Sequence, residues 1–82
     1  MRKENPTIVI LEILKNEYKL SEESIITKKA FFRILSKILA EFNIYSTSAL
    51  YSYYNKLKRD GAIEETEDGT IKIHFSKFKI WQ

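Results

Sequence analysis

Residues 39–63, LAEFNIYSTSALYSYYNKLKRDGAI, constrain the fold of this chain more than any other segment. An apolar helix end leads into a short turn at residues 43–45. Ser46 or Thr47 can cap the helix that follows, because their hydroxyls accept hydrogen bonds from free N–H groups at a helix start. Gly61 then ends this helix, and a strand begins. The order of parts predicts two helices joined by a tight turn and followed directly by a β-strand.

The length and composition predict one globular domain over residues 1–82. With 44% hydrophobic and 30% charged residues, the chain can bury one modest core and is too apolar for a disordered protein. The absence of cysteine excludes disulfides and thiolate metal sites. The longest apolar run, residues 8–11, is far shorter than the ~20 residues of a spanning helix, and the N-terminus lacks a signal-peptide core. We therefore expect an intracellular, cytoplasmic protein without membrane contact.

The apolar periodicity predicts an α+β fold with three helices, a short strand and a C-terminal hairpin. Asn5 is suited to cap the first helix, with Pro6 in its first turn, and Thr27 is suited to cap the second. The helices are expected at about residues 6–18, 27–42 and 47–60.

Strand-like runs on both sides of an Asp-Gly pair at residues 68 and 69 predict the hairpin, over about residues 62–75. A β-type run at residues 24–26 predicts the short strand. In the tail, residues 76–82, Phe78 and Ile80 fall out of phase with the preceding strand, so we expect a bulge or break near Ser76 and Lys77. Trp81 is expected to pack against the domain.

The second and third helices each show an apolar face opposite a polar one. The residues expected to point inward are Phe31, Ile34, Leu35, Ile38 and Phe42 on the second helix and Leu50, Tyr53, Tyr54 and Leu57 on the third. The apolar residues of the first helix occupy roughly 200° around the helix axis. This apolar face is wider than the ~100° face that a single core contact requires. We therefore expect a homodimer that meets through the first helix, the C-terminal tail or both; the alternative is that the domain itself surrounds this helix.

Charge is distributed unevenly along the chain, whose formal net charge is +3. Residues 1–59 carry eleven basic and six acidic residues, whereas residues 60–82 carry three basic and five acidic residues. Between Ser24 and Arg59 there are seven basic residues and one acid, Glu41. A basic helical part beside a slightly acidic hairpin favours an anion-binding surface. A solvated basic surface is the alternative interpretation.

The outward face of the third helix carries side chains that suit DNA bases. A helix fits the major groove, and its outer side chains read base edges through hydrogen bonds. Asn55 can form two hydrogen bonds with adenine, while Arg59, Lys56 and Lys58 would suit phosphates or guanine. The predicted base-readout residues are Ser48, Tyr51, Ser52, Asn55 and Arg59. Alternatively, these are ordinary polar residues of a surface helix.

Contacts with the phosphate backbone are predicted around this face. Lys28 and Lys29 stand at the start of the second helix, where positive charge opposes the helix dipole. A phosphate bound there would explain this placement, because helix-terminal N–H groups also bind phosphate. The predicted backbone-contact residues are Thr27, Lys28, Lys29, Tyr45, Ser46, Thr47, Lys56, Lys58, Thr70 and Lys72.

The hairpin tip is acidic, with Glu64, Glu65, Glu67 and Asp68. Phosphates would repel these four carboxylates, and tips that enter the minor groove usually carry Arg or Lys. We therefore expect the hairpin mainly to support the domain and to touch DNA only along its returning strand. If the hairpin meets a protein instead, the partner would be basic.

No catalytic, metal or cofactor site is predicted. His74 is the only histidine and has no cysteine or second histidine with which to share a metal. The carboxylates are not accompanied by a nucleophile and a base. We expect a protein that is not an enzyme and that has no cofactor and no evident small-molecule ligand.

In these features the chain resembles the winged helix-turn-helix superfamily of transcriptional regulators. The segment STSALYSYYNKLKRDGAIEE looks like its recognition helix and first wing strand, with Leu50, Leu57, Gly61 and Ile63 at the apolar and turn positions. The chain departs from the pattern in a turn that is one residue longer, with Asn43 where Gly is frequent, and in its acidic wing tip. The Lys/Ile/Tyr-rich, cysteine-free composition is similar to that of small regulators of archaeal viruses and plasmids.

The resemblance implies a homodimer that binds double-stranded DNA in the host cytoplasm or nucleoid, with the third helix in the major groove, and that regulates transcription. Two alternatives remain open. One is a winged-helix protein-interaction module that uses the acidic hairpin and the first helix. The other is a DNA-binding accessory protein of replication or partition.

Overall fold

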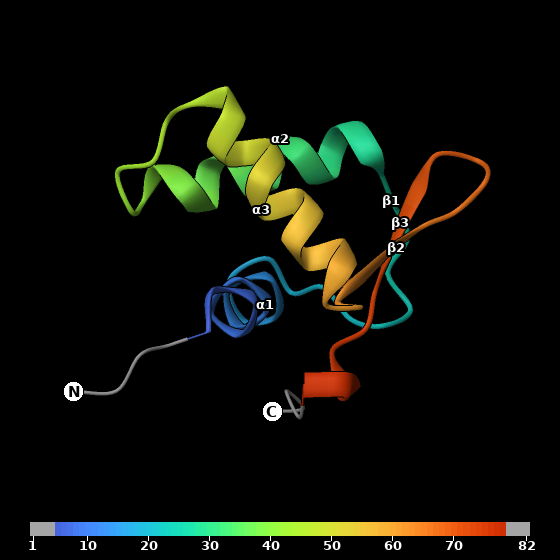
Figure 1. Cartoon of the computed structure of the whole chain (residues 1–82). Coiled ribbons are helices and arrows are strands. Elements are labelled where there is room, and N and C mark those ends of the chain that lie inside the picture. Colours follow the sequence, from blue (N-terminus) through green and yellow to red (C-terminus); the bar gives the residue numbers. More distant parts are fainter. Residues whose placement is uncertain (1–4, 79–82) are drawn as a thin grey trace.

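The computed structural model describes residues 5–78 and has a small α+β fold (Figure 1). Three helices accompany a three-stranded antiparallel sheet with the strand order β1-β3-β2. The elements are α1 (Pro6–Asn16), β1 (Ile26–Thr27), α2 (Lys28–Ala40), α3 (Thr47–Arg59), β2 (Ile63–Glu65), β3 (Thr70–Ile73) and the short 3-10 helix η1 (Ser76–Phe78). In Figure 1, α2 and α3 cross above α1, and the β2–β3 hairpin lies beside the N-terminal end of α2.

The helices start where the sequence predicts, because each has a polar side chain that caps its first turn. The Asn5 side chain accepts a hydrogen bond from the Thr7 N–H, and the Thr27 hydroxyl accepts one from the Ala30 N–H. The Ser46 hydroxyl, one of the two caps considered for the third helix, accepts from the Ala49 N–H. These bonds satisfy N–H groups that have no partner inside the helix.

Two residues with positive φ end α2 and α3. Asn43 has φ 64° and Gly61 has φ 79°, the left-handed conformation that glycine and asparagine adopt most readily. In each case the next N–H turns back to a carbonyl of the last helical turn: Ile44 to Leu39 at 3.0 Å and Ala62 to Leu57 at 2.9 Å. This geometry directs Ile44 and Ala62 toward the core.

Several element bounds differ from the sequence prediction. The first helix ends at Asn16 instead of residue 18, and α2 ends at Ala40 instead of residue 42. The short strand is Ile26–Thr27, later than the predicted residues 24–26, because Ile26 pairs with Ile71 and Thr27 with Thr70. Ile25, predicted to lie in the strand, is 70% exposed.

The hairpin is also shorter than the predicted span of residues 62–75. Strand β2 pairs with β3 from Ile63 opposite Ile73 to Glu65 opposite Ile71. After β3 the chain leaves the sheet and enters η1 at Ser76, where the change of phase in the sequence predicts a break. Phe78 is half-buried, whereas the expectations for Ile80 and Trp81 lie outside the described residues.

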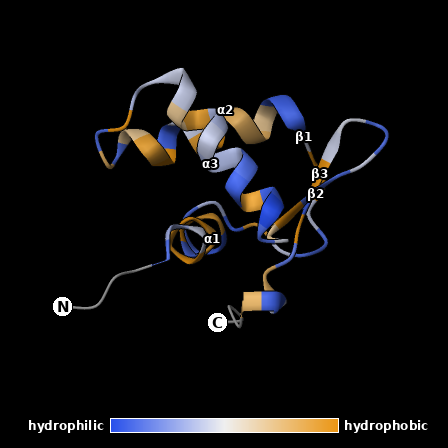
Figure 2. Ribbon diagram, in the orientation of Figure 1, coloured by the Kyte–Doolittle hydropathy of each residue, from blue (hydrophilic) through white to orange (hydrophobic). Residues whose placement is uncertain are grey.

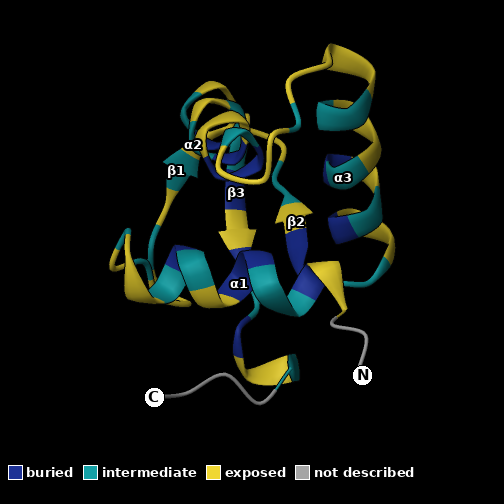
Figure 3. Cartoon of the chain, turned by 90° about the vertical axis from the view of Figure 1, so that its left-hand side faces the viewer, coloured by how far each residue is buried: buried dark blue, intermediate teal, exposed yellow. Residues whose placement is uncertain are grey.

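The core lies between the three helices and the inner face of the sheet. Figure 3 shows buried residues on the sides of α1 and α3 that face the strands. The buried hydrophobic residues are Ile10, Leu11, Leu14, Phe31, Leu35, Ile38, Leu39, Tyr54, Leu57, Ala62, Ile63, Ile71, Ile73 and Phe75. Phe42 was predicted to point inward but is 50% exposed, because α2 ends before it; Leu39 is buried instead.

Candidate nucleic-acid interface

One side of α3 faces the core and the other faces solvent. Tyr54 and Leu57 are buried, while Leu50 and Tyr53 are half-buried against the core. Figure 3 shows exposed residues along the outer side of this helix, and Figure 2 shows that its C-terminal half is mostly hydrophilic. Four of the five predicted base-readout residues lie exposed on α3 at a spacing that places them on one side: Ser48, Ser52, Asn55 and Arg59.

The fifth residue, Tyr51, lies at the seam between α3 and α2. Its ring centroid is 5.2 Å from that of Phe32, and Phe32 in turn lies 4.4 Å from the ring of Tyr54. The Tyr51 ring therefore packs along α2, although the residue is 52% exposed. Phe32 was not singled out in the sequence, because it stands outside the apolar face of α2.

The start of α3 presents exposed polar groups. Tyr45, in the loop between α2 and α3, is 76% exposed, and Ser46 and Thr47 are exposed as well. The Ser46 hydroxyl, which caps the helix, also lies 3.4 Å from the hydroxyl of Ser48.

Glu65, on β2, contacts side chains of both α2 and α3. Its carboxylate accepts a hydrogen bond from the hydroxyl of buried Tyr54 on α3. One carboxylate oxygen lies 2.9 Å from Nζ of Lys28 at the start of α2, and the other lies 3.4 Å from Nζ of Lys58 on α3. Both lysine ammonium groups also lie 5.7 Å from the centroid of the Tyr54 ring. Two of the predicted phosphate contacts therefore share one carboxylate of the protein itself.

This environment strongly favours the ionised form of Glu65. The Tyr54 hydrogen bond and the nearby Lys28 and Lys58 ammonium groups lower the pKa of the Glu65 carboxyl to about 2. Burial, together with the hydrogen bond to Glu65, raises the pKa of the Tyr54 hydroxyl, which therefore stays protonated as a donor.

The Glu65 contacts should make the stability of the protein depend on pH in the acid range. Because folding lowers the carboxyl pKa from an ordinary 4.5 to about 2, the stabilisation is complete above pH 4.5 and is lost as the pH falls through 2. The denaturation midpoint of Glu65→Gln should lie below that of the wild type at pH 7, and the gap should close between pH 4.5 and 2. A gap that stays constant over this range would show that ionisation of Glu65 does not stabilise the fold.

The Lys56 side chain forms an ion pair with Asp60, the residue that follows α3. Its Nζ lies 3.3 Å from a carboxylate oxygen of Asp60, and the same oxygen accepts a 2.7 Å hydrogen bond from the hydroxyl of buried Thr7. The Thr7 hydrogen bond, with help from Lys56, lowers the pKa of the Asp60 carboxyl. Asp60 thus fixes the end of α3 to α1, and Lys56 extends this contact.

The outer face of α2 is basic. Lys29, Arg33 and Lys37 are exposed, as the sequence predicts for the polar face of this helix. Thr27, predicted to contact phosphate, is exposed at the helix start, where its hydroxyl is engaged as the cap.

The hairpin uses most of its polar groups internally. The Thr70 hydroxyl donates to Asp68 at 2.9 Å and lies 2.6 Å from the hydroxyl of Thr66. Lys72, exposed on β3, stands opposite Glu64, whose carboxylate lies 3.1 Å from Nε2 of His74. Of the two predicted backbone contacts in the hairpin, Thr70 is therefore committed to the turn, whereas Lys72 is exposed on the outer face.

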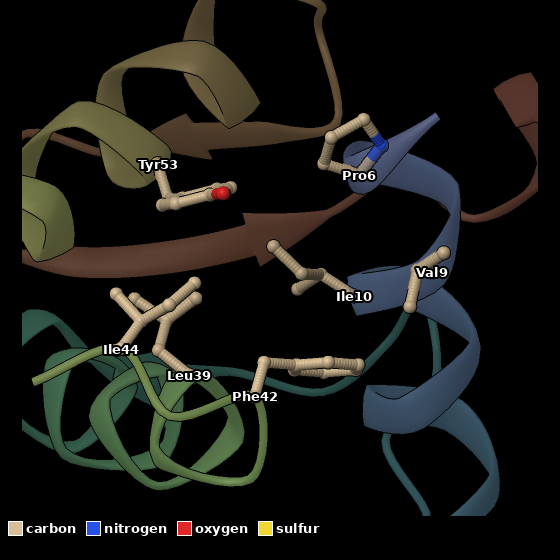
Figure 4. Close-up of a pocket in the computed structure, with 7 residues that line it drawn as sticks. All are labelled: Pro6, Val9, Ile10, Leu39, Phe42, Ile44 and Tyr53. Carbon is tan, nitrogen blue, oxygen red and sulfur yellow. The ribbon is translucent and has the colours of Figure 1, made fainter. Parts of the chain in front are cut away.

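An apolar hollow of about 230 Å³ lies between α1 and the end of α2 (Figure 4). Figure 4 shows side chains from α1, α2, the following loop and α3 around it. They are Pro6, Val9, Ile10, Leu39, Phe42, Ile44 and Tyr53. The half-exposed Phe42 therefore borders a concave apolar surface.

Comparisons with known protein families, with curated proteins and with solved structures find no match to this chain. None of the helices in residues 5–78 combines the length and apolar character that a membrane crossing requires. Within the same residues, no three histidine or carboxylate side chains are grouped as metal ligands.

Proposed function

We propose that this chain is a winged helix-turn-helix protein that binds double-stranded DNA and regulates transcription. The order of elements supports the proposed fold: a short strand, two helices joined by a turn, and a hairpin that pairs with the short strand. In this fold α3 is the recognition helix and the β2–β3 hairpin is the wing.

The observation that carries the proposal is the two-sided character of α3. Tyr54 and Leu57 anchor the helix in the core, while Ser52 and Asn55 stand exposed on its outer side. A rigid helix with short hydrogen-bonding side chains outward meets the requirements for reading bases in the major groove. Ser48 and Arg59 extend this surface toward the two ends of the helix.

Basic side chains border α3 on the side of α2 and suit the phosphate backbone. Lys28, at the start of α2, and Lys58, on α3, both lie beside Glu65. Lys29, Arg33 and Lys37 continue the positive surface along α2. Contacts of this kind supply affinity for any duplex and position the protein for base readout. Lys72, exposed on the wing, is available for a further contact with the backbone.

The test is duplex binding over a salt series, followed by selection of bound fragments from the source genome. We expect binding to a random duplex that weakens steeply with salt, together with enrichment of a pseudo-palindromic site if the protein is a homodimer. Enriched fragments at promoters would support transcription regulation, whereas fragments at an origin would favour a replication or partition accessory protein. Absence of duplex binding at low salt would refute the proposal.

Lys28→Ala should weaken binding to every duplex by a similar factor. The lysine lies beside α3 and suits a phosphate rather than a base, so the slope of log K against log salt should fall by about one unit. The measurement is the affinity for specific and random duplexes between low and moderate salt. Lys19→Ala, on the loop after α1, is the matched control and should leave the slope unchanged.

The second candidate function is a winged-helix module that binds a protein. The apolar hollow between α1 and α2 favours it, because a concave apolar surface with Phe42 at its border can accept an apolar side chain. A Phe42→Ser variant that loses a protein partner, in a chain that ignores all duplexes, would support this candidate over DNA binding.

A further inference from the structure

The geometry around Glu65 points to a role that goes beyond holding the hairpin in place. We propose that Glu65 competes with the DNA backbone for Lys28 and Lys58, so that this carboxylate limits the affinity of the protein for any duplex. The inference rests on the proposed DNA binding and deepens it, because it identifies a residue that lowers affinity within the same surface.

The carboxylate is the fixed member of this cluster. The hydroxyl of Tyr54, a residue only 3% exposed, donates to it, and Glu65 belongs to strand β2, which pairs with β3 along its length. The two lysines are the more exposed members: their side chains are 49% and 41% exposed, against 30% for Glu65, and long stems with several rotatable bonds carry their ammonium groups. On contact with DNA, the lysines can therefore turn outward while the carboxylate stays.

The competition follows from the chemistry of the partners. A phosphate oxygen and a carboxylate oxygen make the same kind of charge-assisted hydrogen bond to an ammonium group. In the free protein Glu65 already supplies that partner to Lys28 at 2.9 Å and to Lys58 at 3.4 Å. DNA must replace these contacts, and the fixed negative charge left behind repels the nearby phosphates. Exposed ion pairs are weak, so this arrangement moderates affinity without preventing binding.

Glu65→Gln removes the charge and keeps the size of the side chain. We expect this variant to bind a random duplex about five-fold more tightly at low salt, since an exposed pair is worth at most about 1 kcal/mol, which corresponds to that factor. Its denaturation midpoint at pH 7 should fall, because the fold loses the same contacts. Tighter binding together with lower stability distinguishes competition from a role in positioning the lysines, which would lower both.

The matched control is Glu67→Gln, the same charge change at the exposed hairpin tip. Glu67 is not a partner of Lys28 or Lys58 in the described part of the chain, so its loss should raise affinity less than two-fold. In a Lys28→Ala, Lys58→Ala background, Glu65→Gln should gain no more than Glu67→Gln does. If Glu65→Gln does not fold, Tyr54→Phe, which removes the anchor of the carboxylate, should shift affinity in the same direction by a smaller factor.

The outcomes separate this inference from the proposed function. A wild-type protein that binds duplexes, with Glu65→Gln binding no more tightly than Glu67→Gln or more weakly than the wild type, overturns the competition alone. A wild-type protein that binds no duplex overturns the DNA-binding proposal and the competition with it. Tighter binding that disappears when both lysines are removed establishes the competition.

Discussion

Leu57→Ala should lower the free energy of unfolding by about 2–5 kcal/mol, the range for truncating a buried leucine. Leu57 is 1% exposed, and together with Tyr54 it accounts for the buried residues of α3. Its carbonyl also accepts the Ala62 N–H that ends the helix. A loss of this size is a large fraction of the stability of a small domain, and chemical denaturation measures it directly.

Leu50→Ala is the control for this substitution, because it removes the same atoms from the same helix. Leu50 is half-buried at the edge of the core, so fewer contacts are lost and the neighbouring side chains can close around the gap. We expect it to cost no more than about half as much as Leu57→Ala. Equal losses for the two variants would mean that α3 is not held to the core mainly through Leu57.

The starts of the three helices and the end of α3 could be predicted from the sequence because these features depend on local chemistry, whereas α1 and α2 each end two residues earlier than predicted. Asn5, Thr27 and Ser46 accept hydrogen bonds from the first turns of their helices, and Gly61 adopts the positive φ that ends α3. The outward arc of α3 follows from helical periodicity alone. Each of these features depends on only a few residues that are close together in the sequence.

Features that depend on packing between distant segments could not be predicted in the same way. Strand β1 is defined by its pairing with β3, more than forty residues later, so its position differed from that of the local apolar run. The place of the Tyr51 ring depends on Phe32, a residue of another helix. Nothing in the local pattern around either aromatic residue identifies the other.

Glu65 is a residue of the candidate site whose role the sequence pattern does not reveal. The sequence groups it with the other hairpin acids, as a carboxylate that would repel DNA. A period of two along β2 places Glu65 on the same face as buried Ile63, and that signal could have separated it from exposed Glu64. Its three partners, however, come from α2 and α3, so only the fold reveals that it holds Lys28 and Lys58.

Asn55→Ala should reduce binding to the specific site by ~1–3 kcal/mol while leaving random-duplex affinity nearly unchanged. Asn55 is exposed near the middle of the outer side of α3, with Leu57 two residues away buried in the core. An amide at this position can donate to and accept from one adenine edge, a pair of bonds that no alanine can replace. The measurement is the ratio of specific to random affinity at a single salt concentration.

Asn16→Ala provides the matched control, since it makes the same chemical change at an exposed position at the end of α1. It should alter neither affinity, and neither variant should unfold at a lower denaturant concentration than the wild type, because alanine favours a helix more than asparagine does. Affinities for the specific and the random duplex then distinguish a base contact from a phosphate contact. A lost base contact weakens only the specific complex, whereas a lost phosphate contact weakens both complexes and flattens the salt dependence. Equal weakening of both complexes by Asn55→Ala would therefore remove the outer side of α3 from base readout and leave it, at most, a contact for the backbone.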